Sequence, residues 1–83
     1  MYKITKLTKH ITDDGKEKTI APKPEGLDHK FRLLDGDGII YAYGYSNTCD
    51  DDNAFSPLDD YENAWGVVQI DYKNQETGEW EML

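Results

Sequence analysis

The sequence has little cysteine, few prolines and no long apolar run. Its single cysteine, Cys49, has no partner for a disulfide within the chain, so packing and hydrogen bonds alone must hold the fold. No stretch is long and apolar enough to cross a membrane, and residues 1–5 lack the apolar run of a secretory signal. From these absences we expect a cytoplasmic protein.

Positive charge is also scarce, and it is absent from residues 33–72. The net charge of the 83 residues is −8. Residues 1–32 hold eight basic side chains against five acidic ones, a balance of +3, whereas residues 33–83 hold one against twelve, a balance of −11. Such a negative field repels phosphate, so we expect no direct binding of nucleic acid and no binding to an anionic membrane. It favours a basic protein surface as the partner.

What the sequence does contain is a regular succession of strand and turn signals. A chain of this length forms one domain, residues 1–83, and its ten aromatic side chains can anchor a core. Short β-branched and aromatic runs alternate with turn sequences that contain Asp and Gly. We predict a mainly β protein, close to the α+β class, with an antiparallel sheet of three hairpins. Their strands are 2–12 with 16–21, 29–34 with 39–46, and 67–73 with 79–83.

The parity of the side chains predicts which of them share a face of the sheet. A change of parity near Thr5 and Lys6 predicts a β-bulge. In strand 39–46 we expect an aromatic row on one face and small residues on the other, beneath a closely packed neighbour such as a helix. The row is Tyr41, Tyr43 and Tyr45, and the small residues are Ala42 and Gly44. The last hairpin is expected to bury Val68, Ile70, Tyr72, Trp80 and Met82.

Residues 55–66 carry the signals of one short helix, which we predict at residues 57–64. Ser56 is a favourable N-cap, and Asp59 lies where a capping box needs a carboxylate. Pro57 suits the first helical position, and Gly66 can end the helix. The inner stripe of this helix would consist of Phe55, Leu58, Tyr61 and Trp65.

The densest feature of the chain is acidic. Six carboxylates fall within thirteen residues that contain no Lys or Arg: Asp50, Asp51, Asp52, Asp59, Asp60 and Glu62. Because gathering like charges costs stability, one interpretation is a binding surface that imitates the phosphates of nucleic acid. The alternative is a solvated segment that keeps a small protein soluble. Tyr61, inside this segment, is a candidate aromatic anchor for a partner.

No pattern for a cofactor, a metal or a catalytic group stands out. Residues 35–38 and 50–53 offer oxygen ligands of the kind calcium prefers, but neither matches an EF-hand loop, and the first is a simple hairpin turn. His10 and His29 have no recognisable nucleophile to activate. The aspartates after Cys49 should raise its pKa and disfavour the thiolate. We therefore expect a non-catalytic protein with no cofactor and no metal.

The tyrosine row raises one further possibility, a platform on which nucleic-acid bases stack. Such a platform needs basic side chains interleaved with the rings. Residues 33–72 contain no basic residue, so we assign the row, with Tyr61 and Trp65, to the core and to interface cover.

Three segments resemble small acidic proteins carried by bacterial phages and other mobile elements: 31–38 followed by Tyr41, 55–61, and 80–83. In size and charge the chain is similar to anti-CRISPR and anti-restriction proteins. This resemblance implies an inhibitor in the cytoplasm of a bacterial host. It would bind the basic surface of a defence protein, such as a nucleic-acid-binding complex, through the acidic second part. A second hypothesis is a structural or regulatory module that assembles through the edge strand 16–21 or the C-terminal hairpin.

Overall fold

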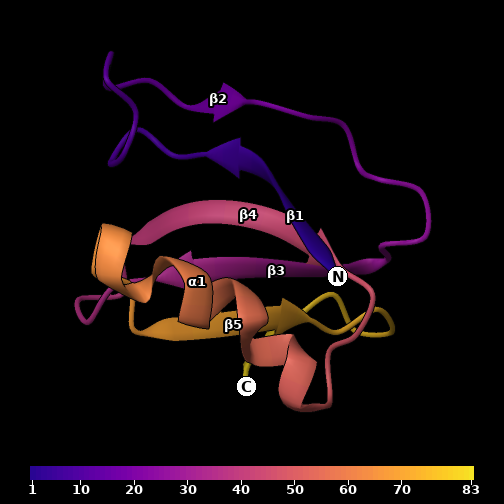
Figure 1. Cartoon of the computed structure of the whole chain (residues 1–83). Coiled ribbons are helices and arrows are strands. Elements are labelled where there is room, and N and C mark those ends of the chain that lie inside the picture. Colours follow the sequence, from indigo (N-terminus) through magenta and orange to yellow (C-terminus); the bar gives the residue numbers. More distant parts are fainter.

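The computed structural model describes all 83 residues as a six-stranded antiparallel sheet with one helical layer against it (Figure 1). The order across the sheet is β2-β1-β4-β3-β5-β6, and every neighbouring pair is antiparallel. A short 3₁₀ helix, η1 (Asp52–Phe55), runs directly into the helix α1 (Ser56–Trp65). The predicted class, with three hairpins and one short helix, is confirmed. The strands are β1 (Tyr2–Leu7), β2 (Lys18–Thr19), β3 (His29–Leu34), β4 (Ile40–Ser46), β5 (Gln69–Lys73) and β6 (Trp80–Met82).

The turn between β3 and β4 is built around one carboxylate. Asp35 accepts hydrogen bonds from the backbone N–H groups of Asp37 and Ile39, at 2.9 and 3.0 Å. It also accepts one from the Tyr41 hydroxyl at 3.1 Å. These bonds favour the charged carboxylate and hold the pKa of Asp35 below its usual value, with the bond from Ile39 as the largest cause. The Asp-Gly-Asp-Gly sequence is thus used as a hairpin turn.

The bulge predicted in β1 is confirmed. The pairing of β1 with β4 shifts between Ile4 and Lys6, so that Thr5 is the extra residue. Because of this shift, Lys3 and Lys6 lie on the same face of the sheet although they are three residues apart. That face is opposite the one that buries Ile4.

A second bulge lies in β4, and the alternation of side chains in the sequence does not predict it. Ala42 pairs with Leu33, but Leu34 pairs with Ile40, so Tyr41 has no direct partner. Tyr41 packs toward the core and stacks on the His10 ring, with 6.4 Å between the ring centroids. The predicted row of three tyrosines is therefore wrong. Only Tyr43 and Tyr45, in the second half of the strand, share one face of the sheet.

The helical layer begins one turn earlier than predicted. Asp51 is the N-cap of η1, and its side chain accepts a hydrogen bond from the Asn53 N–H at 3.0 Å. Since η1 continues into α1, Ser56 is already inside the helical run and makes no capping bond. The predicted Ser56 cap and Asp59 capping box are therefore wrong. The C-terminus is as predicted, because Gly66 adopts a φ of 73° and its N–H bonds to a helix carbonyl at 3.0 Å.

The core lies between the helical layer and one face of the sheet (Figure 1). Leu58, Tyr61 and Trp65 pack against it, as predicted for the inner stripe of α1. Phe55 does not: its side chain is 38% exposed, because Ala54 takes the buried position in η1. The buried cluster consists of Ile4, Phe31, Leu33, Ala42, Ala54, Val67, Ile70 and Tyr72.

Gly44 permits the tightest contact in this core. A methyl group added at Gly44 would collide with the Phe31 ring and with the backbone carbonyl of Lys3. The close neighbour predicted over the small residues of β4 is thus a side chain of the adjacent strand rather than a helix. Glycine is required here by space and not by backbone conformation.

Val68 differs from its predicted burial. Ile70 and Tyr72 are buried as predicted, but Val68 is 64% exposed. The strand begins only at Gln69, so the alternation does not extend back to Val68, and Val67 fills the core instead.

Trp80 and Met82 also differ, because they do not point into the core. Tyr72, a core residue, pairs with Glu81, so the residues on either side of Glu81 lie on the opposite face of the sheet. Trp80 pairs with Lys73 there, and Met82 is 71% exposed at the sheet edge.

Candidate functional site

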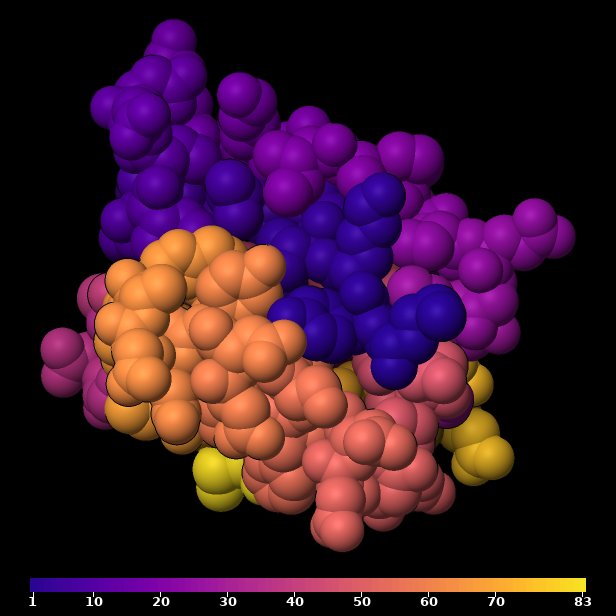
Figure 2. Space-filling model, in the orientation of Figure 1, coloured from indigo at the N-terminus to yellow at the C-terminus, as the bar shows by residue number.

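The predicted site residues lie along one continuous segment, in the helical layer and at the end of the loop before it. We call this surface the acidic layer and define it by Asp50, Asp51, Asp52, Asp59, Asp60 and Glu62, all of which are exposed. The segment comprises the end of the β4–η1 loop, η1 and the first turns of α1. Figure 2 shows this segment in salmon and orange as one continuous area on this side of the molecule.

Three of the six carboxylates accept hydrogen bonds within the fold. Asp51 caps η1, as described above. Asp60 accepts a hydrogen bond of 2.5 Å from the Tyr2 hydroxyl, which ties α1 to β1. Burial, together with this carboxylate, raises the pKa of Tyr2 well above its ordinary value. Asp50 accepts a long bond, 3.4 Å, from the Thr48 hydroxyl.

The other three carboxylates, Asp52, Asp59 and Glu62, make no side-chain hydrogen bond and no ion pair. Asp59 and Glu62 are three residues apart on α1, so they are neighbours on its surface. Leu58, Tyr61 and Trp65 occupy the inner side of the same helix, which leaves these carboxylates facing solvent.

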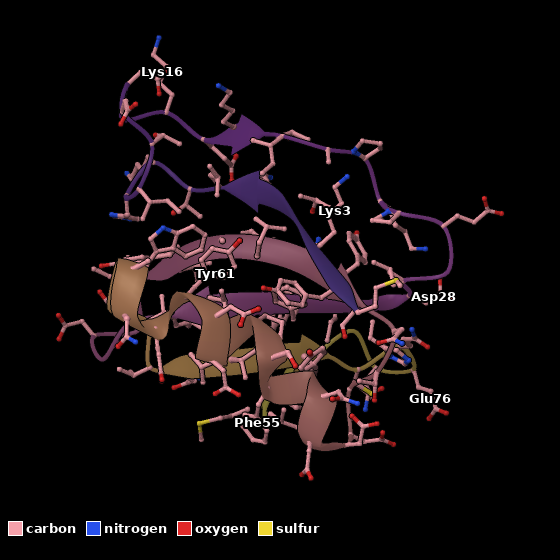
Figure 3. The ribbon with its side chains drawn as sticks, in the orientation of Figure 1. Lys3, Lys16, Asp28, Phe55, Tyr61 and Glu76 are labelled. Atoms are coloured by element: carbon pink, nitrogen blue, oxygen red, sulfur yellow. The ribbon has the colours of Figure 1, made fainter.

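No basic side chain neutralises the acidic layer. The protein has three ion pairs, and none of them includes a carboxylate of this layer. In Figure 3, Lys16 lies at the tip of the β1–β2 hairpin, at the opposite end of the molecule from Phe55 in η1. Lys16 is therefore far from the acidic layer. The ion pairs are Lys6–Glu17, Lys23–Asp28 and Arg32–Asp71, at 3.2, 2.7 and 2.8 Å.

Tyr61, the candidate anchor, is held in the packing between helix and sheet. It is half-buried and stacks on Trp65, with 4.2 Å between ring centroids and 19° between ring planes. Figure 3 shows Tyr61 between α1 and the strands. A partner would therefore reach only the outer part of this ring.

A second region, around Cys49, does not have the chemistry of a nucleophile. A hollow of about 420 Å³ is lined by Cys49, His29 and Tyr72 among others. Burial raises the pKa of the Cys49 thiol, and Asp50 and Asp51 raise it further, so the thiol stays protonated at neutral pH. No group of three His, Cys, Asp or Glu side chains lies close enough to hold a metal ion. None of the helices is long and apolar enough to span a membrane.

The sheet face opposite α1, which we call the open face, is the feature that the sequence did not reveal. Across β1, β4 and β3, Tyr45 lies between Lys3 and Lys30, and in the next row Tyr43 lies between Lys6 and Arg32. Both rows depend on the pairing of β1 with β4, which are more than thirty residues apart. On the neighbouring strands β5 and β6, Lys73 pairs with Trp80 on the same face.

The geometry thus gives one sheet with an acidic layer on one side and a face of cations and aromatic rings on the other. Comparison of the chain with protein-family models, with curated proteins and with solved structures found no match.

Proposed function

We propose that this protein is a phage-type inhibitor, similar in action to anti-CRISPR proteins. It binds the basic, nucleic-acid-binding surface of a host defence protein through the acidic layer. The observation that supports the proposal is the lack of counter-charge: six exposed carboxylates share one layer, and none is paired with Lys or Arg. Like charges at neighbouring helix positions destabilise the fold by a few tenths of a kcal/mol per pair. A basic partner would remove this repulsion on binding.

The layer imitates phosphate in charge rather than in chemistry. Carboxylates on a rigid helix present anionic acceptor oxygens, as the phosphates of a nucleic-acid backbone do, and Arg and Lys side chains recognise both groups. Asp52, Asp59 and Glu62 are the proposed contacts, because their oxygens have no other partner in the fold. Asp51 and Asp60 support the layer by holding η1 and α1 in place.

The test compares two triple variants of equal charge. D52N/D59N/E62Q removes the free carboxylates of the layer. E25Q/E76Q/E79Q removes three exposed carboxylates outside it, none of which makes a side-chain hydrogen bond or ion pair. Each immobilised protein is exposed to a bacterial lysate that contains a CRISPR or a restriction complex. The proposal expects the wild type and the second variant to retain a subunit of that complex, and the first variant to lose it.

Added salt and added DNA should both release the retained subunit, because they compete for the same basic surface. Equal retention by the two triple variants, or retention that DNA does not disturb, would contradict the proposed use of the acidic layer.

The alternative, assembly through an edge strand, finds less support in the sheet edges. The edge strands β2 and β6 are two and three residues long, and β2 carries Lys18. Short, charged edges are a common means by which proteins prevent strand pairing between molecules. Light scattering separates the two ideas, since an inhibitor of the proposed kind is monomeric at micromolar concentration, whereas an edge-assembled module is not.

A further inference from the structure

The open face combines cations with aromatic rings more densely than any other part of the molecule. The ammonium groups of Lys6 and Lys30 lie 5.8 and 5.4 Å from the centre of the Tyr43 ring. Lys23, from the loop before β3, lies 5.7 Å from the centre of the Tyr45 ring. The interleaving of rings and basic groups that residues 33–72 lack in sequence is therefore supplied by β1, β3 and this loop.

Trp80 extends the same face toward the other edge of the sheet. The Arg32 guanidinium lies 4.5 Å and the Lys73 ammonium 5.9 Å from the centre of the Trp80 ring. The Trp80 ring itself lies 6.0 Å from that of Tyr43. The rings of β4 and β6 thus form one aromatic surface bordered by cations.

The acids near this face are already paired. Asp71 is buried and accepts hydrogen bonds from Arg32 at 2.8 Å and from Gln69 at 2.7 Å. Glu17 pairs with Lys6 at the far edge, and Asp28 pairs with Lys23 at 2.7 Å. Lys3, Lys30 and Lys73 have no acidic partner, and Lys30 lies close enough to other lysines to feel their charge. Burial, followed by repulsion from Lys73 and Lys6, lowers the pKa of Lys30.

Two hollows flank Tyr43 on this side. One, of about 220 Å³, is lined by Lys6, Lys23, Lys30 and Tyr45 as well as Tyr43. The other, of about 610 Å³, is lined by Tyr43 together with Lys9, His10 and Lys16. Glu17, the partner of Lys6, also lines the larger hollow. Tyr43 therefore lies between two hollows that each contain lysines, and an anionic chain that crosses its ring would have cations on both sides.

We propose that the open face binds single-stranded nucleic acid, with bases stacked on Tyr43, Tyr45 and Trp80 and with phosphates held by the unpaired lysines. Charge complementarity supports an anionic occupant, and the rings select among anions. A duplex keeps its bases stacked inside and would use only the lysines, whereas an unpaired strand can use lysines and rings together. An acidic peptide would leave the ring faces without a planar partner.

This proposal departs from the expectation of no direct contact with nucleic acid. That expectation followed from the net charge and from residues 33–72, but the cations of the open face come from other parts of the chain. Lys30 and Lys73 lie over rings without an acidic partner, and because exposed cation–π contacts are weak, they can swing aside to phosphates when a base arrives. Lys6, Lys23 and Arg32 also lie over the rings, but each is paired with a carboxylate. The acidic layer lies on the other side of the sheet.

Binding is tested with a fluorescein-labelled oligothymidylate of about 15 nucleotides, near the upper limit of what one small domain covers. An oligouridylate of the same length is the second arm, which separates DNA from RNA. We expect saturable binding at low salt, with a log–log salt slope of about −2 to −3 for three to four phosphate contacts. No binding of either strand at low salt would overturn the proposal.

Matched pairs of variants locate the site. Lys30→Gln should weaken binding at least about three-fold and reduce the salt slope by about 0.7, whereas Lys18→Gln, on the far edge strand, should change neither. Tyr43→Leu should weaken binding at least about five-fold, whereas Phe55→Leu, an exposed ring on the helical side, should not. Thermal unfolding of each variant checks that it is folded. If Tyr43→Leu does not fold, the comparison of Lys30→Gln with Lys18→Gln still tests the site.

Competing ligands decide the class of occupant. A duplex of the same sequence and a polyglutamate peptide should compete weakly. Equal competition by either of them, or binding that is unchanged in Tyr43→Leu, would show a surface for polyanions without base stacking and would overturn the proposal. The D52N/D59N/E62Q variant should still bind the oligonucleotide, so the outcome is independent of the acidic layer.

Discussion

Phe31 packs over Gly44 so closely that no side chain fits between the ring and the Lys3 carbonyl. Gly44→Ala must therefore displace a buried ring or a strand backbone, and we expect a loss of about 1–3 kcal/mol in the free energy of unfolding. Gly36→Ala is the control, because nothing lies near a methyl group added there. Urea denaturation should show a change of less than about 0.5 kcal/mol for Gly36→Ala. Equal losses for the two variants would contradict the packing argument.

A second residue-scale prediction concerns the Tyr72 phenol. Its hydroxyl donates a hydrogen bond of 2.7 Å to the Ala54 carbonyl, and burial raises its pKa to about 12 from an ordinary 10.0. The folded protein therefore holds this proton more tightly than the unfolded chain. The stabilisation is complete below pH 10 and is lost as the pH rises through 12.

Tyr72→Phe removes this titration from the fold. We expect the variant to lose about 1–2 kcal/mol at neutral pH, because the Ala54 carbonyl remains buried without a donor. Between pH 9 and 11.5 its free energy of unfolding should fall less steeply than that of the wild type. Denaturation curves at several pH values measure both effects, and parallel pH profiles for the two proteins would show that Tyr72 has an ordinary pKa.

At the scale of elements, the start of the helical layer provides a matched comparison. Asp51 caps η1, whereas Ser56, the cap predicted from the sequence, lies inside the helical run. We expect Asp51→Ala to cost about 1 kcal/mol of stability and Ser56→Ala to cost less than about 0.5. Asp51→Asn retains the cap but not the charge, so its stability should stay near that of the wild type. A larger loss for Ser56→Ala than for Asp51→Ala would reverse the assignment.

The elements that the sequence predicted are those whose signals are local. The turn at Asp35, the end of α1 at Gly66 and the bulge at Thr5 each arise from residues within a few positions of one another, and each is confirmed. Two of the errors lie at element ends. Val68 precedes its strand, and Phe55 ends η1 before the inner stripe of α1 begins, so periodicity extended beyond the element misplaces both.

The open face shows why the remaining features could not be predicted from the sequence. Tyr45 meets Lys3 and Lys30 only because β4 pairs with β1 on one side and with β3 on the other, and Tyr41 leaves the row only because β4 bulges there. The pairing of β1 with β4 joins distant parts of the chain, and no local pattern announces it. The acidic layer, in contrast, is one continuous segment, which is why its six carboxylates were found from the sequence.

At the scale of the whole molecule, the two charged surfaces lie on opposite sides of one thin sheet. Each leaves several charges of one sign without a partner: Asp52, Asp59 and Glu62 on one side, and Lys3, Lys30 and Lys73 on the other. Segregation of this kind costs stability, since the same charges interspersed would attract one another. Binding by both surfaces would account for it.

The last prediction separates a binding role of the acidic layer from the solubilising alternative. A solubilising charge serves equally well anywhere on the surface, whereas a binding layer must be concentrated. In low salt, where the Debye length is about 30 Å, D52N/D59N/E62Q should therefore be more stable than E25Q/E76Q/E79Q by about 0.2–0.5 kcal/mol for each repulsive pair relieved. In 1 M salt, with a Debye length of about 3 Å, the difference should vanish. Urea denaturation of the two variants at both salt concentrations measures this difference.

A variant that is more stable yet unable to retain the defence protein would show that these carboxylates are kept for a partner at a cost to the fold. Equal stability at low salt would instead identify them as ordinary solubilising charges.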